Sequence, residues 1–235
     1  MSNDVATTVW GEIEGTTITF PMEVDRFDAA TFTFSVPADA AQRLLPGDAF
    51  EVLETDGQAS LVIALCDYNE NPWGDYLEIN LGFLVRAVDA PEGETGSFVY
   101  RMPVDQAFTC RAGNEVMGFP KTVEELSVGT TDGRVTFAMH DGGDLVLSIS
   151  FPDQAATGTP ERVVTDSYSY LDGEPYATSL SMDLGTGFID PSDVTIELGS
   201  GPVADELRSL GLPKAPDFGA WGRDLSATFE LGRPI

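Results

Sequence analysis

The chain has 235 residues, of which 42% are hydrophobic, enough for one sizeable core. Its charge is unusual, because 39 acidic residues stand against 12 basic ones and give a formal net charge of −27. Such a charge repels nucleic-acid phosphates and anionic membranes, which argues against both as partners. The acids are spread over the whole chain, so we expect a surface adapted to high salt, where charges are screened within ~3 Å at 1 M.

Neither a targeting segment nor a membrane segment is predicted. Met1–Asp4 is not the basic start of a signal peptide, and no run approaches the ~20 apolar residues that cross a bilayer. We therefore expect a cytoplasmic protein. Cys66 and Cys110 lie far apart in apolar surroundings, which favours two free thiols over a disulfide framework.

Short runs of β-branched and aromatic residues alternate with Gly, Pro and Asp, a pattern typical of strands and turns. One of them, Ala59–Cys66, is almost continuously apolar, as in a strand buried on both faces. A turn is expected at residues 89–95. The predicted strands are Thr17–Val24, Ala30–Val36, Ala59–Cys66, Asp75–Val88, Gly96–Pro103, Arg134–His140, Asp144–Phe151, Arg162–Leu171, Tyr176–Leu184, Asp193–Leu198 and Asp224–Leu231.

Only three short helices are predicted, each followed by a proline or glycine that ends it. They are Ala40–Leu45 with Asp39 as its cap, Asp105–Ala112 before Gly113, and Val203–Leu210 before Gly211. Many strands and few helices indicate a mainly β domain. A closed or strongly curved antiparallel sheet would also remove the exposed edges that so many strands leave.

Several familiar kinds of catalytic site are excluded by residue types. One His and two separated Cys do not make a zinc site of usual composition. Serine hydrolysis would need His140 as its base, yet His140 ends a strand beside a turn and no Gly-x-Ser-x-Gly elbow occurs. Neither a dinucleotide fingerprint nor a phosphate-binding loop is present. We expect no metal and no cofactor.

Lys121 has the most suggestive surroundings. It and Lys214 are the only lysines in a chain with ten arginines. Residues 116–119 are apolar or small, and Pro120 restricts the backbone just before Lys121. Arg stays protonated, whereas a Lys in an apolar pocket can lose its proton and attack a carbonyl. The alternative is a solvated surface lysine, which is the commoner case.

The order of residues around Lys121 resembles a known motif. Glu115-Val-Met-Gly-Phe-Pro-Lys121 is similar to the Gly-Arg-Glu-x-x-Gly-Tyr/Phe-Pro-Lys motif of the acetoacetate decarboxylase family. Phe32–Pro46, Tyr76–Glu78 and Glu197–Lys214 resemble further family segments in the same order. The resemblance implies a single domain over residues 1–235, with the β-barrel of that family and a few short helices. It also implies a homo-oligomer.

The resemblance assigns expected roles to particular residues. In the family, the Lys after the Pro forms a Schiff base with the substrate, so Lys121 is the expected nucleophile. Glu78 is expected to orient the substrate or move protons. Met117 and Phe119 are expected to form the apolar wall of the substrate site. Arg26 is a candidate contact for the substrate carboxylate.

Glu115 has two interpretations, since it could line the pocket or bind backbone N–H groups; the second, structural role is favoured. The sequence departs from the family pattern at two neighbours of the motif, where Thr122 replaces a second Lys and Asn114 replaces an Arg. A second acid is also missing from Ala59–Cys66. Without a cationic neighbour, desolvation would have to activate Lys121.

These observations predict a Schiff-base lysine enzyme that decarboxylates acetoacetate or a related β-keto acid without a cofactor. An aldolase or dehydratase acting on keto acids would need the same lysine but different acids. A third hypothesis is a barrel that binds small ligands without turnover, in which Lys121 is only an anion contact. The partner expected in each case is a small keto acid or a similar ligand.

Overall fold

The structure is a computed structural model that describes residues 7–91 and 93–235. The first six residues of the predicted domain, which include Met1–Asp4, and Glu92 of the predicted turn lie outside the described residues. Strands account for 59% of the chain and helices for 12%. The mainly β prediction is therefore confirmed.

The strands and helices follow one another along the chain in this order. The first half contains β1 (Thr8–Ile13), β2 (Thr16–Phe20), β3 (Met22–Pro37), α1 (Ala38–Gln42), β4 (Phe50–Val52), β5 (Glu54–Thr55), β6 (Gln58–Glu70), β7 (Tyr76–Ala87), β8 (Gly96–Val104) and α2 (Ala107–Met117). The second half contains β9 (Lys121–Val123), β10 (Glu125–Thr131), β11 (Arg134–Asp141), β12 (Asp144–Pro152), β13 (Glu161–Leu171), β14 (Glu174–Leu184), β15 (Gly187–Phe188), β16 (Thr195–Leu198), α3 (Pro202–Ser209), β17 (Phe218–Phe229) and β18 (Arg233–Pro234).

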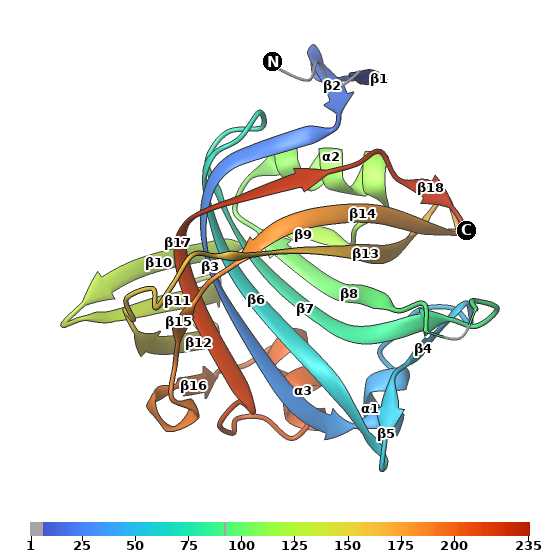
Figure 1. Ribbon diagram of the computed structural model, residues 1–235. Helices are drawn as coiled ribbons and strands as arrows, with labels where there is room; N and C mark the ends of the chain where they lie inside the picture. The colour runs from blue at the N-terminus through green and yellow to red at the C-terminus, as the bar shows by residue number, and fades with distance from the viewer. Residues whose placement is uncertain (1–6, 92) are drawn as a thin grey trace.

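Seven strands close into a barrel, in the order β17, β3, β6, β7, β8, β13 and β14 (Figure 1). The ring closes because β14 also pairs with β17, through Leu180 and Phe229 among others. The predicted closed barrel is confirmed. It contains one parallel junction that an antiparallel sheet does not have, where Ser167 of β13 lies opposite Ser97 of β8.

Alternation along the strands separates the two faces of the barrel wall. In β7, Ile79, Leu81 and Phe83 are almost fully buried in the core outside the barrel. Glu78 and Asn80, which alternate with them in the sequence, face the interior. In β6 the outward residues, such as Leu61 and Ile63, are buried in the same core. Val62 and Ala64 line the cavity and are only partly buried, so the apolar run is fully buried on its outer face but not on both faces as predicted.

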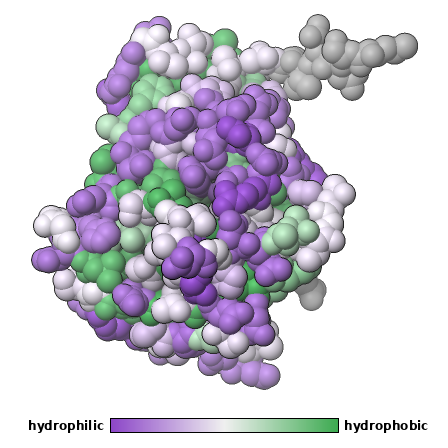
Figure 2. Space-filling view, turned by 90° about the vertical axis from the view of Figure 1, so that its left-hand side faces the viewer, coloured by the Kyte–Doolittle hydropathy of each residue, from purple (hydrophilic) through white to green (hydrophobic). Residues whose placement is uncertain are grey.

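The outer core lies between the barrel and a second sheet of four strands, β10, β11, β12 and β16. Phe151 of β12 packs against Phe32 of β3, with ring centroids 5.3 Å apart. Figure 1 shows this sheet and α3 beside the barrel, away from α2. The face turned toward the viewer in Figure 2 is largely hydrophilic, with scattered apolar side chains.

A second core closes the barrel at α2. There the N-terminal hairpin of β1 and β2 contributes Ile13, Ile18 and Phe20, and α2 contributes Val116 and Met117. Figure 1 shows the hairpin and α2 at the same end of the molecule. This arrangement places the residues just after α2 at the buried end of the barrel interior.

Two predicted helices differ from the structure in their ends. Asp39 lies in the first turn of α1 and pairs with Arg43 instead of capping the helix. The second helix continues through Gly113 and ends at Gly118, whose φ of 65° is the left-handed conformation typical of a helix end. The prediction that the helix ends at Gly113 is therefore wrong. The small size of Gly113 has another role, which is described with the candidate active site.

The strands differ from the prediction mainly at prolines and edges. The predicted strand Thr17–Val24 is interrupted at Pro21, and its second part joins Ala30–Val36 in the long strand β3. The last barrel strand, β17, begins at Phe218, ahead of the predicted Asp224. The edge strand β10 was missed because most of its side chains are exposed and it lacks an apolar stripe.

Candidate active site

Lys121 and Glu78 meet at the buried end of the barrel interior. Nζ of Lys121 lies 2.7 Å from Oε2 of Glu78, and the two residues are only 6% and 4% exposed. The contact is an ion pair without the alignment of a hydrogen bond. Strand pairing brings the residues together, because Lys121 lies opposite Met102 of β8 and Glu78 lies opposite Val104 of the same strand.

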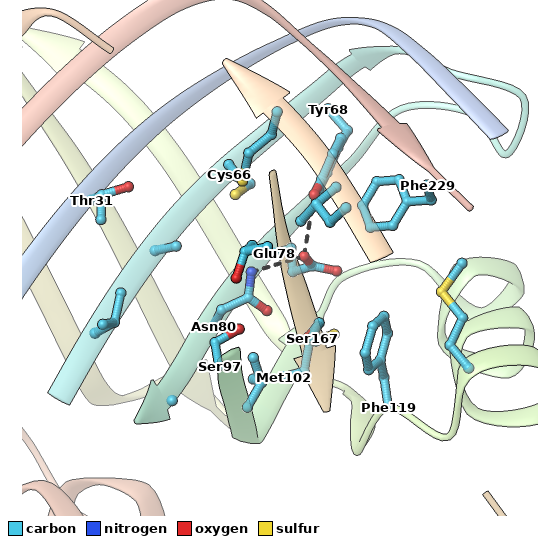
Figure 3. Close-up of a pocket in the computed structure, with 18 of the residues that line it drawn as sticks. Thr31, Cys66, Tyr68, Glu78, Asn80, Ser97, Met102, Phe119, Ser167 and Phe229 are labelled. Atoms are coloured by element: carbon cyan, nitrogen blue, oxygen red, sulfur yellow. Dashed lines mark hydrogen bonds between the residues drawn. The ribbon is translucent and has the colours of Figure 1, made fainter. Parts of the chain in front are cut away.

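The other carboxylate oxygen of Glu78 is held by two polar side chains. Oε1 accepts a hydrogen bond of 3.0 Å from the Asn80 amide and one of 3.4 Å from the Tyr68 hydroxyl. Figure 3 shows both side chains directed toward Glu78. The carboxylate is therefore fixed from both sides, with one oxygen for Lys121 and one for its neighbours.

The amine of Lys121 has two further neighbours. Nζ donates a hydrogen bond of 3.2 Å to the hydroxyl of Thr109, a buried residue of α2, and lies 5.1 Å from the centre of the Tyr76 ring. Burial, and then the charge of Glu78, raise the pKa of Tyr68 and of Tyr76 well above the usual value. Both phenols thus stay protonated and can donate hydrogen bonds.

The backbone of Lys121 is tied to α2 by Asn114. Its amide oxygen accepts a hydrogen bond of 2.9 Å from the Lys121 N–H, and its amide nitrogen donates one of 3.1 Å to the Lys121 carbonyl. These two hydrogen bonds satisfy the backbone N–H and C=O groups of Lys121, as a neighbouring strand would on that side. Asn114, which departs from the family motif, thus positions Lys121 here.

Gly113 makes room for the Lys121 side chain. A Cβ atom at position 113 would lie 2.7 Å from both Cδ and Cε of Lys121, closer than any side chain permits. Any residue larger than Gly would therefore require the Lys121 side chain to shift. The glycine inside α2 is explained by this approach.

A cavity of about 310 Å³ occupies the barrel interior, with Glu78 on its wall (Figure 3). Lys121 also lines this cavity. Met117 and Phe119 belong to its wall, where the resemblance placed them. Of the described residues that line it, Glu78 and Lys121 are the only charged ones. Cys66 also lines it, and burial raises the pKa of its thiol, so Cys66 remains neutral.

The sequence profile described as acetoacetate decarboxylase (ADC) matches residues 11–225. The chain belongs to the acetoacetate decarboxylase family. No curated protein gives a significant match. Within the described ranges no helix is long and apolar enough to cross a membrane, and no cluster of three His, Cys, Asp or Glu side chains is arranged to hold a metal ion.

Solved structures of this family share the fold. An acetoacetate decarboxylase from Legionella pneumophila is 16% identical, with a TM-score of 0.72 over 92% of this chain and 87% of that one. The enduracididine biosynthesis enzyme MppR, solved with pyruvate, is 17% identical, with a TM-score of 0.63 over 94% and 93%. An acetoacetate decarboxylase-like enzyme from Sphingomonas wittichii RW1 is 13% identical, with a TM-score of 0.62 over 98% and 100%.

Arg26, the candidate contact for the substrate carboxylate, and Glu115, for which a pocket role was the alternative to the favoured structural one, both lie outside the cavity. Arg26, on β3, pairs with Glu70 at 3.0 Å and is half exposed. Glu115 pairs with Arg111 at 2.8 Å on the outer face of α2 and is also half exposed. The structure brings neither of them to Lys121, because both side chains face solvent, where ion pairs with neighbours satisfy them.

Thr122, at the position of the family's second Lys, is exposed and is absent from the cavity wall. Successive side chains of a strand point to opposite faces, so the residue after Lys121 turns away from the cavity. The surroundings of Lys121 within the barrel are instead apolar or neutral apart from Glu78.

Three polar residues at the site were not predicted: Tyr68, Asn80 and Thr109. Asn80 could have been found, because it is two residues beyond Glu78 in a strand and must share its face. Thr109 lies four residues before Gly113 on one helix face, but only if the helix runs through Gly113. Tyr68 comes from the neighbouring strand β6, and its register is set by tertiary pairing with Tyr76.

Proposed function

We propose that this chain is a Schiff-base lysine enzyme that decarboxylates acetoacetate or a related β-keto acid to a ketone and carbon dioxide. The observation that carries the proposal is the Lys121–Glu78 pair, 2.7 Å apart and buried at the inner end of an apolar cavity. A buried amine next to a proton acceptor is what imine formation needs. The family to which the chain belongs supports the same chemistry.

The neutral amine comes from proton transfer within this pair. Two charges in an apolar site are costly, and passing a proton from Nζ of Lys121 to Oε2 of Glu78 removes both of them. The hydrogen bonds from Asn80 and Tyr68 favour the carboxylate and oppose the transfer. Glu78 is therefore placed to accept the Lys121 ammonium proton, and it serves as the base of the reaction.

Lys121 then attacks the keto carbon, and loss of water gives a protonated imine. The bond between the α carbon and the carboxylate breaks, its electron pair moves toward the imine nitrogen, and carbon dioxide leaves an enamine. Loss of water has used the proton that Glu78 took from Lys121, so Glu78 takes up one proton from solvent and passes it to the α carbon. Water then hydrolyses the imine to release the ketone and Lys121. The net reaction consumes one proton and needs no cofactor.

The charges of the cavity favour loss of the carboxylate. Among the described lining residues, the only cation is Lys121, and Glu78 carries the same sign as a substrate carboxylate. A carboxylate in such surroundings lacks a partner, whereas carbon dioxide is neutral and needs none. The absence of Arg26 from the cavity therefore does not weaken a decarboxylation mechanism.

An aldolase or dehydratase acting on keto acids is the second candidate. The structurally similar enzyme MppR has been solved with pyruvate and with the condensation product of pyruvate and imidazole 4-carboxaldehyde. The same imine on Lys121 would begin that reaction, but its enamine would attack an aldehyde instead of taking up a proton. A ligand-binding barrel without turnover would form no imine at all.

The proposal is tested by trapping the imine. Reduction with borohydride in the presence of acetoacetate or pyruvate, at high salt, should leave an adduct on Lys121 that mass spectrometry locates. The adduct should vanish in Lys121→Ala and persist in Lys214→Ala, which changes the exposed second lysine. No adduct, or an adduct retained in Lys121→Ala, contradicts both enzyme proposals. Carbon dioxide release from a panel of β-keto acids then separates decarboxylase from aldolase.

The homo-oligomer and the cytoplasmic location remain predictions. With a net charge of −27 per chain, assembly would be favoured by high salt, which screens repulsion between subunits. Sedimentation at low and high salt would measure this dependence.

A further inference from the structure

The cavity extends well beyond the Lys121–Glu78 pair along β7. Glu78, Asn80, Gly82 and Leu84 all line it, and they span roughly 20 Å of strand at ~3.3 Å per residue. Glu78 is 4% exposed, whereas Leu84 at the far end of the row is 39% exposed, so the cavity opens toward solvent at that end. The reacting groups therefore lie at the bottom of a long channel.

The walls of this extension are mainly apolar, with a small residue, Ala64, on the β6 side. Ala64 and Val62 of β6 lie opposite Asn80 and Gly82, and both pairs line the cavity. Ala64 has a small side chain and leaves room inside the barrel over β6. At Gly82 the backbone of β8 approaches closely instead, because a Cβ there would lie 2.8 Å from the Phe98 carbonyl oxygen. Across the channel, Leu180, Met182 and Leu184 of β14 add further apolar surface.

Polarity in this extension is limited to neutral groups. Thr31, Ser97 and Thr165 contribute hydroxyls, and among the described lining residues every charge belongs to Lys121 and Glu78. Figure 3 shows Thr31 well to one side of Glu78, and Phe119 and Phe229 on the other. The part of a substrate that lies away from Lys121 must therefore be uncharged and largely apolar.

We propose that the channel holds the hydrocarbon chain of a medium-chain 3-oxo acid, with its keto carbon at Lys121 and its chain along β7. The keto-acid chemistry of this substrate class rests on the proposed function, and its chain length rests on the size of the channel. A volume of about 310 Å³ corresponds to roughly ten units of ~30 Å³, the share of one water in the liquid. Acetoacetate, with seven non-hydrogen atoms, leaves room for roughly three more units of this size, so an acid of about six to eight carbons fills the space.

The first test is a series of 3-oxo acids from four to ten carbons, assayed at high salt. Each methylene buried in the channel should raise kcat/KM about fourfold, equivalent to ~0.8 kcal/mol, until the channel is full. A flat or falling dependence on chain length overturns the proposal. Such a result would leave imine formation on Lys121 untouched, so the two proposals fail independently.

The second test narrows the channel. Ala64→Phe places a large side chain opposite Asn80, on the β6 side of the channel. It should remove the gain with chain length, so that long and short acids react with similar kcat/KM. Val164→Phe places the same phenylalanine side chain at an exposed position of β13 and should keep the full gain. A gain that persists in Ala64→Phe contradicts the assignment of the chain to this space.

The third test measures binding without chemistry. Secondary alcohols cannot form an imine, so calorimetry with propan-2-ol and octan-2-ol reports on the channel alone in the unaltered protein. Octan-2-ol should bind at least 100-fold more tightly, with the advantage reduced in Ala64→Phe. Equal affinities overturn the proposal even if imines form. Graded affinities without any trapped imine would support the channel and refute the proposed function.

Discussion

At the scale of single residues, the two carboxylate oxygens of Glu78 have different neighbours. Oε2 lies against the amine of Lys121, while Oε1 accepts hydrogen bonds from Asn80 and Tyr68. The second pair of contacts orients the carboxylate, so that the first oxygen is held where a proton can pass to or from Lys121. Lys121 cannot move away, because Thr109 and the Asn114 amide hold its side chain and its backbone.

Glu78→Gln tests this arrangement. Gln has the same shape but cannot take up the proton, and it leaves a buried lysine without its counter-charge. We expect kcat for decarboxylation to fall by about 10²–10⁴-fold, the usual contribution of a positioned acid or base. The matched control is Glu174→Gln, an exposed residue at the start of β14. Steady-state kinetics of both variants decide the matter, and less than a threefold loss in Glu78→Gln would refute the assigned role.

At the scale of elements, α2 and β9 form one unit that presents Lys121 to the cavity. The helix begins with Gln106, whose side chain accepts a hydrogen bond from the Thr109 N–H, and ends at the left-handed Gly118. The chain then turns back, and β9 runs beside β8 with Lys121 as its first residue. Thr109 and Gly113, four residues apart, share the helix face that Lys121 crosses.

Gly113→Ala tests the fit between helix and lysine. Inside an ordinary helix this change would stabilise the protein by ~1 kcal/mol, because Ala is the better helix former. Here the new Cβ would meet the Lys121 side chain at 2.7 Å. We expect the gain in stability to be lost and the rate of imine trapping to fall by 10-fold or more, since a displacement of ~1 Å can cost about 100-fold.

Thermal unfolding and borohydride trapping would be measured together. Gly129→Ala, at a position of β10 with no atom within 4 Å of the new Cβ, serves as the control. Normal trapping in Gly113→Ala would show that the lysine does not depend on this close approach.

At the scale of the whole molecule, negative charge is dense enough to bring carboxylates together. Asp67 lies opposite Asp28 across β6 and β3, with Asp75 and Asp105 also near. Burial, and then these neighbours, raise the pKa of Asp67 above its usual value. A raised pKa means that the folded state holds the Asp67 proton more tightly than the unfolded state does.

The stability associated with Asp67 is therefore fully present below the unfolded pKa of ~3.9 and is lost as the pH rises through the folded value. Asp67→Asn, which stays neutral, should stabilise the protein at pH 7 by up to about 1 kcal/mol at low salt. The gain should disappear below about pH 3.9, and 1 M salt should reduce the part due to like charges.

Urea unfolding at several pH values and salt concentrations checks this expectation. Asp132→Asn, in an exposed turn where Asn tolerates the positive φ of 52°, should change stability by less than about 0.5 kcal/mol. A destabilised Asp67→Asn at pH 7 would contradict the sign of the argument.

Some features of the fold and the site follow from the sequence alone, and others depend on the tertiary structure. The order of neighbouring residues was enough to identify Lys121 as the candidate nucleophile, because its motif is contiguous. It was also enough to indicate a closed sheet of many short strands. The alternation of Tyr76, Glu78 and Asn80 on one face also follows from the two-residue period of a strand. These features depend on neighbours in the chain, so the sequence by itself carries them.

Tertiary contacts decided the rest. The parallel junction of β8 with β13 and the closure of β14 on β17 join strands that are far apart in the sequence, and no local pattern encodes their register. That register delivers Tyr68 to Glu78, keeps Arg26 with Glu70, and opens the channel along β7. Gly113 was predicted to end the helix because glycine often follows a helix. Its small size instead leaves room for the Lys121 side chain, a neighbour that only the folded chain brings close.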